Sequence, residues 1–411
     1  MNACFKSTQI LLPKKGTNMH KWAVVACDQY TSQEDYWKEV ENIVGDAPST
    51  LNLIFPEVYL EKDTKRIDRV HNAMKQYIDN QLLEEKIQDG FVLVERETES
   101  GVRLGLVGVI DLETYDYTPG SSSLIRATEG TIQSRIPPRL KIREGAIMEL
   151  PHIMVLIDDP QQQLIETLYS QKETFEVLYD TDLMLNGGHI KGYAITNNKA
   201  KEVNNLLYTL QQQCNGFFLA VGDGNHSLAT AKTYWENIKK DLPADQQNSH
   251  PARYAMVELV NLHSPALIFE PIHRVLFNVN VQDFVNQLKE HLQSHHIAYE
   301  DGNDIVIIDE NSELGISLLN TDGKLPIDIL QHFIDDYLKI HQETTIDYVH
   351  GEDALQSLGT KKNNCGIRLG TIDKNTLFPA IAAGGVLPRK TFSMGEAHEK
   401  RYYIECRKIM K

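Results

Sequence analysis

The segment from Gly222 to Ser227 holds the residues best suited to chemistry, because a polar turn there follows the apolar run Leu219–Val221. Glycine lets a backbone turn sharply and approach a ligand closely. We expect a helix directly after the turn, and the free N–H groups and partial positive charge at a helix start suit a phosphate. The segment therefore predicts a phosphate cradle formed by Gly222, Gly224, Asn225 and Ser227.

Two side chains in this turn carry reactive groups, Asp223 and His226. The carboxylate could bind Mg²⁺ or accept a proton from an attacking hydroxyl, and the imidazole could donate a hydrogen bond to a phosphate oxygen. The same residues also fit a plain turn, in which Asn225 or Ser227 serves only as the helix N-cap. Neither the Walker pattern GxxxxGK nor GxGxxG is present, so both interpretations stay open.

Arginine is concentrated in a segment rich in proline, glycine and serine between Tyr117 and Gly145. The four arginines are Arg126, Arg135, Arg139 and Arg143. Such a composition predicts little regular structure. The segment fits equally well an ordered loop that grips an anion and a solvated surface loop.

Two later segments pair a turn with basic side chains. Pro271 precedes the pair His273 and Arg274, and a glycine-rich stretch precedes Arg389 and Lys390. Taken alone, each pair is expected to be a solvated surface pair. Patterns of common hydrolases are missing, since the sequence contains neither HExxH nor GxSxG, and His152 is expected to be a structural histidine.

Alternating strand and helix patterns surround the polar turn and must position it. A strand is expected over 216–221 and a helix over 227–239. Nearer the N-terminus, a helix over 65–89 precedes two strands, 90–96 and 102–112, joined by a hairpin turn. This alternation predicts an α/β fold with mixed α and β layers.

Four segments are expected along the chain. An N-terminal α/β lobe, 1–145, ends in the arginine-rich loop 117–145, and a central lobe, 146–278, carries the polar turn. A small α/β insert follows over 279–344, and the C-terminal segment 345–411 returns to the core.

Composition restricts the classes of function. The chain has 411 residues and a formal net charge of −16, and such an acidic surface repels nucleic acids and anionic membranes. The five cysteines form no CxxC pair, which favours reduced thiols over a zinc site or a disulfide framework. We find no signal-peptide pattern and no apolar run of about 20 residues, so we expect a cytoplasmic protein without a membrane segment.

Taken in order, four segments resemble the bacterial and archaeal family catalogued as domain of unknown function 1015. The matching stretches are Arg126–Thr131, Gly222–Ser227, Pro271–Arg274 and Leu387–Thr391. The central turn is also similar to the phosphate-binding turn of the ParB/sulfiredoxin superfamily. That resemblance implies a ParB/sulfiredoxin-like mixed-sheet core with additional α/β lobes.

The polar turn departs from the family pattern at two positions. Asn225 stands where the family has a histidine, and Ser227 stands where it usually has an arginine. Losing that arginine removes a cation that would bind a phosphate, and Arg126, Arg274 or Lys390 could compensate for it.

The resemblance implies three functional hypotheses. The first is phosphoryl transfer between ATP or ADP, with Mg²⁺, and a small hydroxylated metabolite such as serine. The second is a sensor that binds a nucleotide or phosphometabolite without turnover. The third is a DNA-associated, ParB-like protein, which the charge of −16 disfavours.

Under the first hypothesis, the catalytic residues are Asp223, His226 and Glu129, with Asp223 or Glu129 orienting the hydroxyl and sharing Mg²⁺. The residues expected to bind phosphate or nucleotide are Gly222, Gly224, Asn225, Ser227, Arg126, Thr131, His273, Arg274, Arg389 and Lys390.

Overall fold

The computed structural model describes residues 3–60, 62–63, 65–388 and 390–410. Arg389 lies outside the described residues. The chain forms two compact units. The first comprises the chain up to Ala127, Thr131–Leu267 and the residues from Gly395 onward, and the second comprises Thr128–Gly130 and Ile268–Met394.

A mixed sheet, eleven-stranded within the described residues, is the centre of the first unit. Its main path runs β10, β11, β4, β5, β13, β9, β12, β7, β6, while β1 pairs with β5 and β2 with β4. The strands are β1 Phe5–Lys6, β2 Thr8–Pro13, β4 Leu83–Thr98, β5 Gly101–Asp111, β6 Tyr115–Asp116, β7 Ile125–Ala127, β9 Met154–Ile157, β10 Val177–Asp182, β11 His189–Thr196, β12 Leu219–Asp223 and β13 Tyr254–Asn261. Parallel pairs join β12 to β7 and β13 to β9, and the other central pairs are antiparallel.

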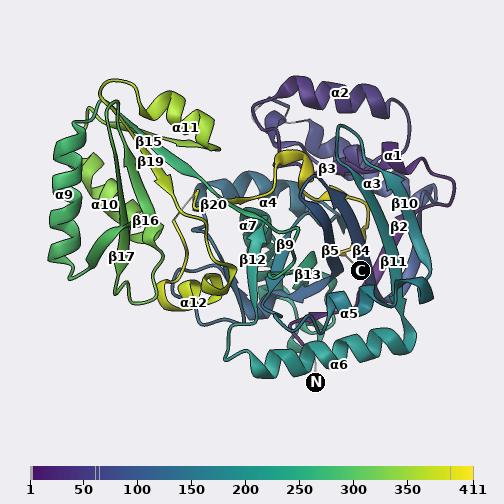
Figure 1. The fold of residues 1–411 in the computed structure, drawn as a ribbon. Helices are drawn as coiled ribbons and strands as arrows, with labels where there is room; N and C mark the ends of the chain where they lie inside the picture. Colours follow the sequence, from purple (N-terminus) through teal and green to yellow (C-terminus); the bar gives the residue numbers. More distant parts are fainter. Residues whose placement is uncertain (1–2, 61, 64, 389, 411) are drawn as a thin grey trace. The chain divides into compact units, whose positions relative to one another are not determined.

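Helices of the first unit cover both faces of this sheet (Figure 1). They are α1 Met19–Trp22, α2 Glu34–Val44, α3 Arg66–Asp79, α4 Ile136–Glu144, α5 Ile165–Tyr169, α6 Asn197–Gln213, α7 Asn225–Ile238 and α8 Ala244–Gln247. Successive side chains of a strand point to opposite faces. Val92 and Val94 of β4 therefore pack with residues of α2 and α3, whereas Phe91 and Leu93 pack with residues of α5, α6 and α7.

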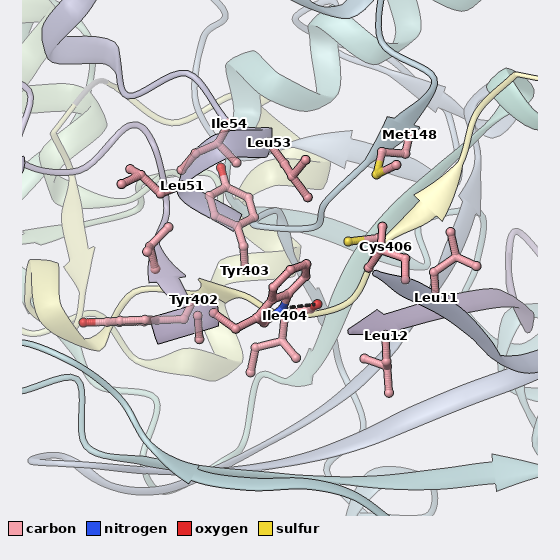
Figure 2. Close-up of a cluster of buried hydrophobic side chains, with 14 of the residues drawn as sticks. Leu11, Leu12, Leu51, Leu53, Ile54, Met148, Tyr402, Tyr403, Ile404 and Cys406 are labelled. Carbon is pink, nitrogen blue, oxygen red and sulfur yellow. Dashed lines mark hydrogen bonds between the residues drawn. The ribbon is translucent and has the colours of Figure 1, made fainter. Parts of the chain in front are cut away.

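The C-terminal segment is built into the core of the first unit. Strand β21, Tyr402–Tyr403, pairs with β3, Val24–Val25, and β22, Arg407–Lys408, pairs with β8, Met148–Glu149. Figure 2 shows Tyr402, Tyr403 and Ile404 among the buried side chains, where Trp22 Nε1 donates a hydrogen bond of 3.0 Å to the Ile404 carbonyl.

The second unit has a five-stranded antiparallel sheet in its described residues, in the order β17, β16, β19, β15, β18. Its strands are β15 His273–Phe277, β16 Ala298–Ile308, β17 Glu313–Leu319, β18 Thr345–Val349 and β19 Asn364–Leu369, with the separate pair β14 Phe269–Pro271 and β20 Phe392–Met394. Its helices are α9 Val281–Ser294, α10 Pro326–Ile340, α11 Glu352–Gly359 and α12 Lys374–Gly384. The prediction of a mixed α/β fold is confirmed, and no helix of the described residues is long and apolar enough to cross a membrane.

Two expectations about local structure are wrong. The segment 83–89, expected to continue a helix, belongs to β4 and pairs with β2. The arginine-rich segment is not a loop throughout, because Ile136–Glu144 forms α4 with prolines in its first turn, where a missing N–H costs nothing.

Candidate functional site

The turn between β12 and α7 is built around Gly224, whose φ of 79° favours glycine. An added Cβ there would lie 3.1 Å from the Ile153 Cα, so the backbone just before β9 would have to shift to admit a side chain. Helix α7 begins at Asn225, and no side chain caps it at Gly224. The first N–H groups of a helix have no partner within the helix, so those of Asn225, His226 and Ser227 are available as donors.

Asp223 ends β12 directly before these amides, and its carboxylate is held by two partners. Oδ1 accepts a hydrogen bond of 2.9 Å from the Gly224 N–H, and Oδ2 lies 3.2 Å from Lys400 Nζ. Burial raises the pKa of Asp223, but the charge and hydrogen bond of Lys400, together with the Gly224 amide, outweigh it and lower the pKa. The carboxylate is therefore ionised at neutral pH, which suits both a metal ligand and a proton acceptor.

His226 follows in the first turn of α7, and its ring is neutral. Nε2 accepts a hydrogen bond of 3.2 Å from the Ile132 N–H. Burial, followed by the positive charges of Arg139 and Arg135, lowers the pKa of His226 to about 4. The ring proton is thus on Nδ1, so a hydrogen bond from His226 to a phosphate would come from that nitrogen and not from Nε2.

The neutral His226 predicts an acid-dependent loss of stability. The histidine pKa is about 4 in the folded protein and near 6.5 in the unfolded chain, so only the unfolded chain gains this proton as pH falls from 6.5 to 4. The stabilising contribution is complete above pH 6.5 and is lost toward pH 4. We expect the melting temperature to fall between pH 7 and pH 5 by about 2 °C more in the wild type than in His226→Gln, in thermal unfolding followed by circular dichroism. Equal falls in the two proteins would contradict the assignment.

His152, expected to be only structural, lies at the start of α7. Its Nε2 is 2.8 Å from Ser227 Oγ, and its Nδ1 is 2.9 Å from the Tyr403 hydroxyl. The carboxylate of Asp28 is 3.9 Å from Nε2. The sequence held a weak signal for this position, since His152 lies two residues before β9, the neighbour of β12.

Two of the arginines expected to bind an anion are paired with acids. On α4, the Nε–H group of Arg139 donates a hydrogen bond of 2.8 Å to Glu57 Oε1, and Arg143 Nη2 lies 2.6 Å from Glu149 Oε2. Arg135 is close enough to act electrostatically on His226. Glu57 is 82 residues from Arg139 in the sequence, and Glu149 lies just beyond the arginine-rich segment, so the segment's apparent excess of positive charge was misleading.

Arg126 does not reach the polar turn. Although β7 pairs with β12, the Arg126 guanidinium donates to the carbonyls of Ser123 and Gly216 and stacks on the Phe217 ring at 4.5 Å. Gly216 and Phe217 precede β12, at the end of the strand remote from α7. The expectation that Arg126 binds phosphate beside Asp223 therefore disagrees with its placement.

Two polar atoms around the turn have unfilled hydrogen-bonding capacity. Asn225 Oδ1 and Thr131 Oγ are buried and lack a hydrogen-bond partner among the described residues. Thr131 adjoins Ile132, whose N–H meets His226, so both atoms lie around the start of α7. Buried polar atoms usually find a partner, and unfilled capacity here favours a ligand-binding turn over a plain one.

The remaining predicted residues belong to the second unit, which brings three of the four segments together. Leu387 N–H donates a hydrogen bond of 2.7 Å to the Thr128 carbonyl. Glu129 and Leu387 form an isolated parallel β-bridge at the same place. Ile272 N–H donates to the Thr391 carbonyl at 3.3 Å.

Within these segments, His273 and Arg274 are buried. His273 Nδ1 accepts from the Leu369 N–H at 3.2 Å, and Arg274 Nε donates to Gln331 at 3.3 Å. Burial lowers the pKa of Arg274 to about 10. The expectation of a solvated surface pair is wrong, because these side chains pack inside the second unit. Lys390 is exposed, at a φ of 59°.

Comparison with known proteins identifies the family. Residues 11–364, most of the chain, match the family described as "Protein of unknown function (DUF1015)". The chain belongs to this family. Among curated proteins, none matches the sequence.

The solved structures that match this chain have low sequence identity to it. A free serine kinase in complex with AMP is 8% identical, with 74% of this chain and 90% of that chain covered and a TM-score of 0.36. A conserved hypothetical protein from Pyrococcus furiosus is 9% identical, with coverages of 74% and 94% and a TM-score of 0.33. SbnI from Staphylococcus aureus is 8% identical, with coverages of 70% and 83% and a TM-score of 0.35. At these TM-scores the likeness carries no argument about the function of this DUF1015 protein, and the ParB/sulfiredoxin-like core stays a prediction.

Proposed function

We propose that this DUF1015 protein binds ATP or ADP through a phosphate at the start of α7 and transfers a phosphoryl group to or from a small hydroxylated metabolite such as serine. One observation carries the proposal. Helix α7 begins without a side-chain cap immediately after an ionised carboxylate, Asp223, that is held by Lys400. The turn thus supplies donors for phosphate oxygens and a base, and Lys400 adds a cation beside it.

Phosphoryl transfer depends mainly on positioning and on stabilising negative charge as it spreads over the phosphate oxygens. The amides of Asn225, His226 and Ser227 supply fixed dipoles that need no reorganisation. Lys400 supplies the positive charge that the family arginine, replaced here by Ser227, would otherwise give. Asp223 accepts the proton of the attacking hydroxyl, since Lys400 keeps its pKa low and its oxygens free of a proton.

Among the described residues, carboxylates could bind Mg²⁺ only together with the phosphates of a nucleotide. No group of three or more His, Cys, Asp or Glu side chains within the described part of the chain could hold a metal on its own. Proteins commonly hold Mg²⁺ through one or two carboxylates, phosphate oxygens and water. Asp223 would serve as that carboxylate, and the ion would neutralise charge on the phosphates.

A non-catalytic sensor is the alternative that the same turn supports. The amides and Lys400 would bind the phosphate, while both Asp223 oxygens stay engaged by Gly224 and Lys400. Product formation separates the two functions, since a sensor binds nucleotide without turnover. DNA binding remains disfavoured by the net charge of −16.

Calorimetric titration with ADP and ATP, with and without Mg²⁺, tests the binding proposal. We expect Lys400→Met to weaken nucleotide binding at least about tenfold, since a hydrogen bond to a charged group is worth about 1.5–3 kcal/mol. Lys239→Met is the matched control, because Lys239 pairs with Glu113 at 3.0 Å just after the C-terminal end of α7. Equal affinities for the two variants, or no binding by the wild type, would refute the proposed phosphate site.

A further inference from the structure

Ser227 and His152 form a pair with the geometry of a nucleophile and its base. Ser227 Oγ lies 2.8 Å from His152 Nε2, within the range of a hydrogen bond that passes a proton. The serine is the third residue of α7, so its hydroxyl is beside the amides that begin the helix. Amides in this position can stabilise an oxyanion that forms on a carbonyl attacked by the serine.

The contacts of His152 are compatible with the tautomer that can act as a base. Its Nδ1 meets the Tyr403 hydroxyl at 2.9 Å, and that hydroxyl accepts a hydrogen bond of 3.2 Å from the Cys27 N–H. The phenol oxygen can accept the proton of His152 Nδ1 as well, and in that tautomer Nε2 accepts the proton of Ser227.

Both residues line a cavity of about 150 Å³ in the first unit. Most of its wall is apolar, and Figure 2 shows four of the wall residues, Leu53, Ile54, Met148 and Tyr403, around the buried cluster. The polar wall residues are Ser227, His152 and Thr230, together with the ion pairs of Arg139 with Glu57 and of Arg143 with Glu149. An apolar cavity of about this volume accommodates a benzene-sized molecule.

We propose that Ser227 is a nucleophile with His152 as its base, acting on esters of small apolar carboxylic acids whose acyl group occupies this cavity. Ser227 Oγ attacks the carbonyl carbon and its proton passes to His152 Nε2. The bond to the alcohol oxygen then breaks, and the departing alcohol takes that proton from His152. Water, activated by the same nitrogen, hydrolyses the acyl-serine and restores Ser227. This activity requires no nucleotide, although it uses the same amides at the start of α7 as the proposed phosphate site.

Phenylmethylsulfonyl fluoride tests the pair directly, because its benzyl group matches the cavity. Attack forms the bond from Ser227 Oγ to sulfur, breaks the bond from sulfur to fluorine, and releases the proton through His152 with fluoride. We expect mass spectrometry of the full-length protein and its peptides to find one label, on Ser227. Protein that has not been treated with the reagent should hydrolyse p-nitrophenyl acetate with a burst of nitrophenol, and the label should abolish this hydrolysis.

Variants separate this role from a structural hydrogen bond. Ser227→Ala should abolish the label, and His152→Gln should slow labelling at least about 100-fold, as loss of a general base does. The control is His263→Gln, which removes a histidine paired with Asp158 at 2.7 Å away from this cavity. Circular dichroism checks that each variant is folded. An unlabelled wild type, a label that persists in Ser227→Ala, or a rate unaffected by His152→Gln would each overturn the proposal.

Discussion

Replacing Asp223 with asparagine is expected to slow phosphoryl transfer at least about 100-fold, since a positioned general base contributes about 10²–10⁴-fold. The amide cannot take a proton from the attacking hydroxyl and is a poor ligand for Mg²⁺. It keeps an oxygen that can accept the Gly224 N–H, and Lys400 is 14% exposed and remains in contact with solvent. We therefore expect the melting temperature to change by no more than about 3 °C.

The measurement is product formation from ATP or ADP with pooled amino acids, followed by phosphorus NMR. Asp373→Asn provides the control, because Asp373 also accepts a backbone N–H, that of Asn375 at 3.0 Å, but belongs to the second unit. Wild-type rates in the control together with lost turnover in Asp223→Asn would support the base assignment. Full activity in Asp223→Asn would remove the catalytic proposal and leave binding alone.

Replacing Arg401 with methionine is expected to lower the free energy of unfolding by about 3–5 kcal/mol, because the change breaks a buried charge network. Arg401 is 3% exposed, lies 2.6 Å from Glu258, and also pairs with Glu405. Its loss leaves both carboxylates buried beside fewer positive charges. The neighbouring Arg103 is buried too, and burial lowers its pKa, so it replaces the lost charge poorly.

Urea denaturation of Arg401→Met measures this cost, with Arg368→Met as the control. Arg368 pairs with Glu313 at 3.3 Å and with Glu352 at 3.4 Å, but it is 30% exposed. A partly exposed pair of this kind contributes about 0–1 kcal/mol. Equal losses of stability in the two variants would show that burial adds nothing at Arg401.

The sequence predicts those elements whose pattern is local. The apolar run before Gly222 and the glycines after it predict the strand–turn–helix that the structure shows as β12 and α7, although the helix begins at Asn225, two residues earlier than expected. The hairpin turn at 99–101 is confirmed as well, since Thr98 pairs with Gly101. In both places the turn residues determine the backbone conformation.

A local burial pattern predicts the wrong element where irregular strand pairing alters the spacing of buried residues. In segment 83–90, burial recurs at Leu83, Ile87 and Gly90, a spacing typical of a helix, yet the segment is a strand. The pairing of β2 with β4 shifts register twice, between Thr8 and Ile10 and between Ile10 and Leu11, and such bulges disrupt the two-residue alternation of a strand.

Side chains that meet across long sequence separations could not be predicted. Lys400 beside Asp223, and Tyr403 beside His152, come from a C-terminal segment whose pairing with β3 appears only in the fold. The acid that pairs with Arg139, Glu57, is remote in sequence as well. The candidate site therefore gained its cation and its second histidine from tertiary structure.

A crystal structure of the full-length protein with ADP and Mg²⁺ tests the central claim most directly. The account predicts phosphate oxygens within about 3 Å of the N–H groups of Asn225, His226 or Ser227, with Lys400 in contact with the same phosphate. A nucleotide bound elsewhere, or helix-start amides covered by packed side chains, would contradict it.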